Sequence, residues 1–197
     1  MTDDEEREIV ALMGESMARA RGYADFFGWS LDRNLEEWGV LQALRESLEA
    51  QGRVFYYTDL RIRGRSHDPP DCEARDADGR RVAVEVTELV SEDAIRAYKA
   101  GRVYDFALWD RESFLASLAQ VIARKDSNYP RLKDPPYHGG YELVVFSDEP
   151  MLSRRNVDTY LAGHVLEPPA NLSRVVLLLG YDPGVSRCPI YELYSRA

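Results

Sequence analysis

The segment "RVAVEVTE" at residues 81–88 constrains the fold more than any other stretch of this chain. Its side chains alternate as in a β-strand, so the three valines lie on one face, whereas Ala83, Glu85 and Thr87 lie on the opposite face. We predict that the valines pack in the core and that Glu85 lies outside the apolar layer. The strand is therefore expected to carry the Glu85 carboxylate on the face opposite to the valines.

The residues before this strand predict a β-hairpin over residues 71–88, with "DADG" as its turn. A three-residue loop that ends with Gly79 in the left-handed conformation would place Asp71 directly opposite Glu85. A two-residue turn would instead pair Asp71 with Val86 and separate the two acids. The type of turn thus decides whether the hairpin carries a pair of carboxylates.

Two carboxylates about 5 Å apart on one face of a sheet repel each other. A shared proton, a basic partner or a bound cation relieves that repulsion. Sites of one or two carboxylates with free water positions suit Mg²⁺. The alternative is that Glu85 and Glu88 form ion pairs with surface arginines, which are abundant in this chain.

The remaining sequence predicts an α/β fold in which a mixed central β-sheet is flanked by helices. Helices are expected at residues 3–21, 31–51, 110–126 and 153–162, and further strands at 53–63, 141–147, 174–180 and 190–194. Residues 89–109 are either a loop or a short helix, and residues 127–140 form a Pro/Gly-rich loop. The apolar stripe expected on helix 31–51 comprises Leu31, Leu35, Trp38, Leu41, Leu44 and Leu48. We expect one domain that spans residues 1–197.

Composition predicts a cytoplasmic protein without a membrane segment. The chain is 45% apolar, enough for a full core, but it has no run of about 18 apolar residues and its N-terminus is acidic. Cys72 and Cys188 are far apart and are expected to be reduced. Most of the formal net charge of −9 lies in residues 1–50, which carry −7. The acidic N-terminal helices are therefore candidates for binding a protein partner or a second copy of the chain.

The hairpin residues resemble the motif of the PD-(D/E)xK nuclease superfamily. Pro70 and Asp71 match its first part, Glu85 follows 14 positions later as the second acid, and Thr87 stands where the family has lysine. The predicted order of elements is similar to the αβββαβ core of the restriction-endonuclease-like fold. The resemblance covers residues 31–147; it leaves residues 1–30 as an N-terminal helical extension and residues 148–197 as a C-terminal α/β extension of the same sheet.

Some members of this superfamily supply the lysine from a neighbouring element, and Lys125 is the candidate here. It follows Leu118 and Ile122 on the apolar stripe of helix 110–126, so it faces the sheet. The chain has only three lysines among its 25 cationic residues, which adds weight to this one. The alternatives are that Lys125 is a solvated cation of the last helical turn, or that Lys99 takes the role.

The resemblance implies a Mg²⁺- or Mn²⁺-dependent phosphodiesterase that cleaves DNA or RNA. Asp71, Glu85 and the backbone carbonyl of Val86 would bind the metal, and Lys125 would position the attacking water. Candidate accessory residues are Thr87, Glu88, His67, and Glu46 or Glu49 from the first core helix. The competing hypotheses are a catalytically inactive binding or scaffolding module with the same fold, and a plain ion-pair network in an unrelated domain.

Overall fold

The computed structural model describes residues 33–100 and 107–196. In this part of the chain, three of four helices pack on one six-stranded sheet and the remaining helix, Glu92–Lys99, lies beside it, which confirms the predicted α/β class. The elements are α2 (Arg33–Glu49), β1 (Thr58–Ile62), β2 (Cys72–Arg75), β3 (Arg81–Glu88), α3 (Glu92–Lys99), α4 (Arg111–Asp126), β4 (Gly140–Ser147), α5 (Arg154–Leu161), β5 (Arg174–Leu179) and β6 (Ile190–Ser195). The predicted helix 3–21, with the partner surface expected on it, lies outside the described residues.

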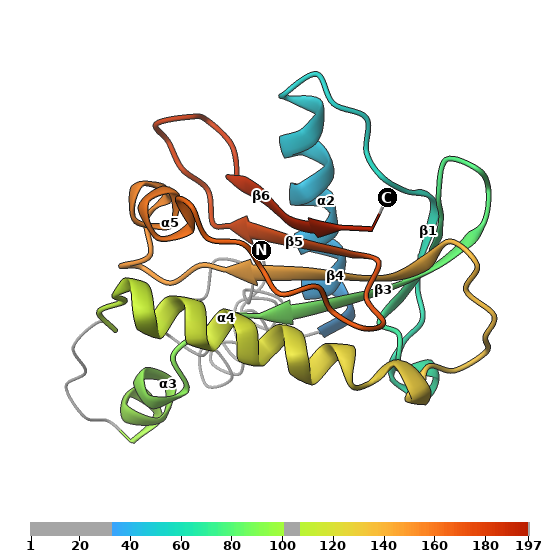
Figure 1. Ribbon diagram of the computed structural model, residues 1–197, viewed down its shortest axis with the longest axis horizontal. Coiled ribbons are helices and arrows are strands. Elements are labelled where there is room, and N and C mark those ends of the chain that lie inside the picture. Colours follow the sequence, from blue (N-terminus) through green and yellow to red (C-terminus); the bar gives the residue numbers. More distant parts are fainter. Residues whose placement is uncertain (1–32, 101–106, 197) are drawn as a thin grey trace, which may run out of the picture.

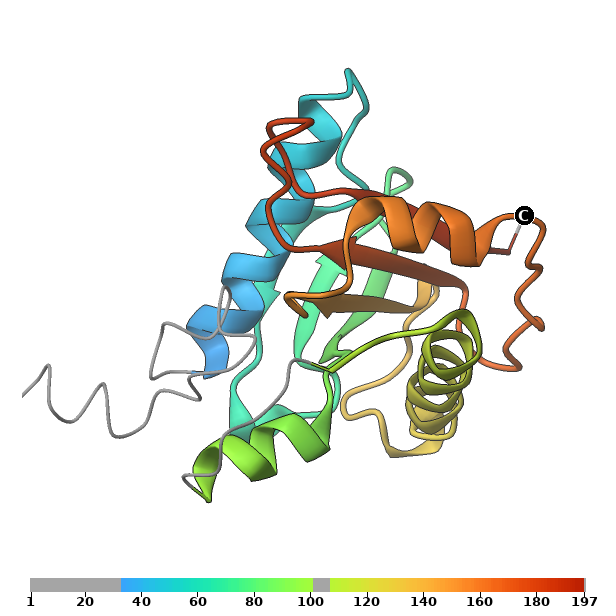
Figure 2. The same ribbon diagram turned by 90° about the vertical axis from the view of Figure 1, so that its left-hand side faces the viewer.

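The sheet has the strand order β1-β2-β3-β4-β5-β6. Strands β3, β4 and β5 are parallel, whereas β1, β2 and β6 run antiparallel to their neighbours. Helix α2 covers one face, and α4 and α5 cover the other (Figures 1 and 2). No helix in the described ranges combines the length and the hydropathy needed to cross a lipid bilayer.

Both faces of β3 are packed, so the prediction that Glu85 lies outside the apolar layer was wrong. The three valines join α2 in one core, and Ala83 joins α4 and β4 in a second core. Glu85 retains only 1% of its exposure. Alternation shows which side chains share a face, but it does not show whether a helix covers that face; strands in parallel pairs are commonly covered on both sides.

The hairpin adopts the three-residue loop. The Asp76 N–H donates to the Arg80 carbonyl at 3.0 Å, and Gly79 has φ +75°. Cys72 pairs with Val84, so the register continues to Asp71 opposite Glu85. The prediction that the turn brings the two acids together is therefore confirmed.

The first strand is shorter than predicted, because residues 53–57 are not part of the sheet. Tyr57 turns inward, is 3% exposed and donates its hydroxyl hydrogen to Glu142 Oε2 at 2.7 Å. Asp59 has φ +51°, and the β1–β2 pairing is irregular there. Aromatic residues are common both in strands and in cores, so the composition of residues 53–57 led us to start the first strand too early in the sequence. The undecided segment 89–109 contains the short helix α3.

Gly140 at the start of β4 is expected to tolerate no side chain. Its φ is +116°, and a Cβ there would lie 2.2 Å from Ser173 Oγ. That hydroxyl donates to the Tyr141 carbonyl at 3.0 Å, which holds it in place. We expect Gly140→Ala to lower the free energy of unfolding by about 3 kcal/mol, from backbone strain and the clash together.

Urea denaturation of Gly140→Ala and Gly163→Ala measures the two contributions. Gly163 also has a positive φ, +69°, but nothing lies within 4 Å of its Cβ position. Its substitution therefore reports backbone strain alone, about 1 kcal/mol. Equal losses for the two variants would contradict the steric argument.

Candidate functional site

The candidate site lies where β2 stops and leaves the edge of β3 open. Strand β2 begins at Cys72, opposite Val84, so the last residues of β3 are paired only with β4. Asp71 Oδ2 accepts a hydrogen bond of 2.9 Å from the Val86 N–H, in the place where a continuing strand would have bonded. The hairpin thus ends in a carboxylate held against an unpaired strand edge.

The Val86 backbone faces the same edge. In an extended strand, the N–H and C=O of one residue point to the same side. Since the Val86 N–H points at Asp71, its carbonyl oxygen is also directed to the open side of β3. Asp71 and the Val86 carbonyl oxygen therefore both lie on the open side of β3, although the Val86 side chain itself packs against α2.

Helix α4 brings Lys125 to both acids. Lys125 Nζ donates a hydrogen bond to Glu85 Oε2 and lies 3.9 Å from Asp71 Oδ2. The side chains of both acids are 1% exposed, and that of Lys125 is 13% exposed. The Tyr141 hydroxyl donates to the Lys125 carbonyl at 2.9 Å and so fixes the end of the helix on β4. The predicted placement of Lys125 on the sheet-facing stripe is confirmed, and its chemical role stays a prediction.

The cluster holds two acids and one cation. Burial, followed by the charge of Asp71, raises the pKa of Glu85 to about 7, and Lys125 opposes that shift only in part. Burial and the same two carboxylates also raise the pKa of Tyr141 above its ordinary range. The site therefore favours an additional positive charge, which a proton or a cation would supply.

The donor set of this cluster fits a hard divalent cation. Glu85 Oε1 is buried and has no hydrogen-bond partner in the described part of the chain. With Asp71 and the Val86 carbonyl, it offers the oxygen ligands that Mg²⁺ and Mn²⁺ accept. Among the described residues, no group of three or more His, Cys, Asp or Glu forms a metal-binding cluster, so the set depends on two carboxylates and one main-chain oxygen.

A cavity of about 490 Å³ opens beside Lys125, between α2 and the last turn of α4. Its walls include Thr87, Glu88, Arg124 and Asn128. Thr87, at the position where the resemblance would have a lysine, is 9% exposed and contributes a short side chain to this wall. The accessory candidates Thr87 and Glu88 thus lie at the site.

Helix α2 contributes two glutamates that the sequence interpretation missed. Glu36 and Glu37 line this cavity, and Glu37 is only 6% exposed. Glu37 lies four residues before Leu41 and seven before Leu44, which is the spacing of the buried stripe. That spacing was a usable signal, whereas Leu35, which we placed on the stripe, is 57% exposed.

The structure does not bring the other accessory candidates to the cavity. Glu46 and Glu49 are exposed, and Glu46 lies about 14 Å further along α2 than Glu37 at 1.5 Å per residue. His67 is exposed in a 3₁₀ turn, where its Nδ1 lies 2.9 Å from Ser66 Oγ. Lys99 is exposed in the last turn of α3.

Comparison with protein-family models, with curated proteins and with solved structures found no match to this chain.

Proposed function

We propose that the protein is a Mg²⁺- or Mn²⁺-dependent nuclease that hydrolyses phosphodiester bonds in nucleic acid. The observation that carries the proposal is the cluster of Asp71, Glu85 and Lys125 at the open edge of β3. The order α2-β1-β2-β3-α4-β4 supports it, because it is the order of a restriction-endonuclease-like core with α3 inserted before α4. The PD-(D/E)xK motif combines two acids with a lysine. Here the Lys125 amine lies within 4 Å of a carboxylate oxygen of both Asp71 and Glu85.

Asp71, Glu85 and the Val86 carbonyl would hold the metal ion. When bound, the metal supplies Lewis acidity: it lowers the pKa of a coordinated water and offsets the charge that develops on the phosphate. The protein itself holds the two carboxylates in place. Asp71 is fixed by the Val86 N–H, and Glu85 is fixed by Lys125.

Lys125 is suited to orient the attacking water and to offset negative charge on the phosphate oxygens. Its amine has three hydrogen atoms to donate, and one of them is used by Glu85. Lys125 lines the cavity beside it, through which a water molecule and a phosphate would reach the amine. The attack of water breaks one P–O bond and yields a phosphomonoester and a hydroxyl group. In this proposal the lysine comes from α4 and not from position 87.

Asp71→Asn is expected to abolish Mg²⁺-dependent cleavage, with a loss on the order of 10³-fold. The substitution keeps the shape of the side chain but removes a ligand charge. The test incubates both proteins with plasmid, linear duplex, single-stranded DNA and RNA, with Mg²⁺ or Mn²⁺. Glu112→Gln, an exposed carboxylate on α4, is the matched control and should leave the rate unchanged.

A binding module without chemistry is the second candidate, and Thr87 at the usual lysine position favours it. Calorimetric titration with Mg²⁺ separates the two. The nuclease requires metal uptake that is lost in Asp71→Asn, whereas the binding module predicts no Asp71-dependent uptake and no cleavage of any substrate. That pair of negative results would overturn the proposal.

A further inference from the structure

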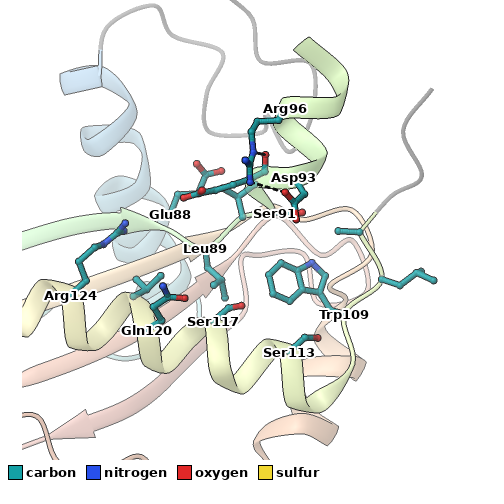
Figure 3. Close-up of a pocket in the computed structure, with 15 residues that line it drawn as sticks. Glu88, Leu89, Ser91, Asp93, Arg96, Trp109, Ser113, Ser117, Gln120 and Arg124 are labelled. Atoms are coloured by element: carbon teal, nitrogen blue, oxygen red, sulfur yellow. Dashed lines mark hydrogen bonds and ion pairs between the residues drawn. The ribbon is translucent and has the colours of Figure 1, made fainter. Parts of the chain in front are cut away.

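A second cavity, of about 670 Å³, adjoins the candidate site (Figure 3). It lies between α4, the N-terminal part of α3 and the chain that follows β3. Glu88 and Arg124 line both this cavity and the one beside Lys125, so the two are neighbours. If a phosphate of a ligand lies at Lys125, the part of the ligand attached to that phosphate would lie at the mouth of the larger cavity.

One face of α4 forms a polar wall of this cavity. Ser113, Ser117, Gln120 and Arg124 all line it, and their spacing of four, three and four residues places them in one row along the helix. Ser117 and Gln120 supply uncharged hydrogen-bonding groups, the Ser113 hydroxyl is engaged with Asp110 in the helix cap, and the row ends in a cation next to Lys125. Such a row matches a ligand with a polar uncharged part and a phosphate at one end.

Trp109 forms the aromatic wall. Its indole extends between α4 and the segment that carries Ser91 and Asp93 (Figure 3). The main chain of Trp109 is anchored, because its carbonyl accepts a hydrogen bond of 2.5 Å from the Tyr160 hydroxyl on α5. Its Nε1 is enclosed without a hydrogen-bond partner among the described residues. The cavity thus has an aromatic ring in its wall, on a main chain anchored to α5, and the indole N–H is buried behind that wall.

The two cations of this cavity differ in availability. Arg96 donates to Asp93 Oδ1 at 2.7 Å, so its charge is already offset. Arg124 is exposed, and its guanidinium forms no ion pair with the part of the chain that the structure describes. Arg124 is therefore the arginine of this cavity that can bind a phosphate with its full charge.

The cavity suits a nucleobase that is free of a duplex. The cavity has the size of a pocket for a single nucleotide, and its lining combines an aromatic ring, an amide and hydroxyl groups with the carboxylates of Glu88, Glu92 and Asp93. A base in a continuous duplex is stacked on both sides and cannot enter a recess between two helices. A base in a single strand, a loop or a bulge can do so.

We propose that this cavity holds an unpaired nucleotide of the substrate, with Trp109 against the base and Arg124 on its phosphate. The protein then acts on single-stranded or looped nucleic acid rather than on continuous duplex. This inference rests on the proposed nuclease function, and it adds a substrate class that the acid–lysine cluster alone does not specify.

Binding in EDTA tests this inference without cleavage. Fluorescence anisotropy with the full chain compares labelled single-stranded DNA and RNA, a bulged hairpin and a blunt duplex of the same sequence. We expect the unpaired probes to bind at least about tenfold more tightly than the duplex, as the loss of a base–aromatic stack would require. Equal affinity for all probes would overturn the inference.

Variants assign the effect to the cavity. Trp109→Ala is expected to weaken binding of unpaired probes about tenfold, with the duplex unaffected, and Trp109→Phe to weaken it less. Arg124→Gln should weaken binding and reduce its salt dependence by about one phosphate contact. Trp38→Phe on α2 and Arg155→Gln on α5 are the matched controls outside the cavity.

The two proposals fail in different ways. Asp71-dependent cleavage without a preference for unpaired probes, or with a preference that Trp109 and Arg124 do not affect, overturns the cavity inference and leaves the nuclease. Tight binding of unpaired probes that requires Trp109, together with no cleavage and no Asp71-dependent Mg²⁺ uptake, retains the cavity as a binding site and overturns the nuclease. Gln120→Ala, at an exposed position, reports on the cavity even if Trp109→Ala does not fold.

Discussion

Glu85→Gln is expected to abolish cleavage and, in the absence of metal, to make the folded protein more stable at pH 8. The activity loss should be on the order of 10³-fold, because the substitution removes the charge of a proposed metal ligand. The gain in stability has a separate cause. Burial and the charge of Asp71 disfavour the ionised form of Glu85 by more than Lys125 favours it.

The direction of the pH dependence follows from the pKa of Glu85. Burial and Asp71 raise it from the ordinary value of 4.5 to about 7 in the folded protein. The folded state therefore binds the Glu85 proton more tightly than the unfolded state does. The wild-type protein loses stability as the pH rises from about 4.5 through about 7, relative to a variant that cannot ionise there.

Urea denaturation in EDTA at pH 4.5 and pH 8 measures this difference. Glu85→Gln should match the wild type near pH 4.5 and exceed it at pH 8 by at most about 3 kcal/mol. The exposed Glu112→Gln variant should show no such crossover. If Glu85→Gln is instead the less stable protein at pH 8, the ionised carboxylate stabilises the fold and the site does not require an additional cation.

The pair of acids was predictable from sequence because a turn sets the register of a hairpin. The glycine at position 79 and the length of the loop together fix Asp71 opposite Glu85, and no distant contact is needed. The position of Lys125 was predictable in part. Its spacing from Leu118 and Ile122 places it on the buried side of α4, but only the packing of α4 across β3 and β4 brings the amine to the acids.

The rest of the site depends on tertiary packing that local patterns do not encode. Glu37 shares the spacing of the buried leucines on α2, but a carboxylate on such a stripe is recognisable only once the end of β3 is known to lie beside it. Trp109 and Gln120 line one cavity only because α3 and the segment after β3 form its opposite wall. The burial of Glu85 also depends on tertiary packing. Helix α4 covers the Glu85 face of β3, and the alternation of side chains does not predict which face a helix covers.

Lys125→Met is expected to be the most destabilising single substitution at the site. It leaves Asp71 and Glu85 buried, close together and without their cation, and methionine keeps most of the apolar volume of the lysine stem. Removing one partner of a buried ion pair costs about 3–5 kcal/mol, chiefly because the remaining charge is uncompensated. Lys125 lowers the pKa of Glu85, so its removal raises that pKa above about 7, and the loss should grow as the pH rises through 7 and be smaller at pH 5.

A double-mutant cycle with Glu85→Gln tests this explanation. If uncompensated charge is the cause, Lys125→Met combined with Glu85→Gln should regain much of the lost free energy of unfolding at pH 8. Lys99→Met, at an exposed position in the last turn of α3, is the matched control and should change stability by no more than about 0.5 kcal/mol. Additive losses in the cycle would mean that Lys125 acts through packing of its aliphatic stem, and its amine would then have no electrostatic role to carry into catalysis.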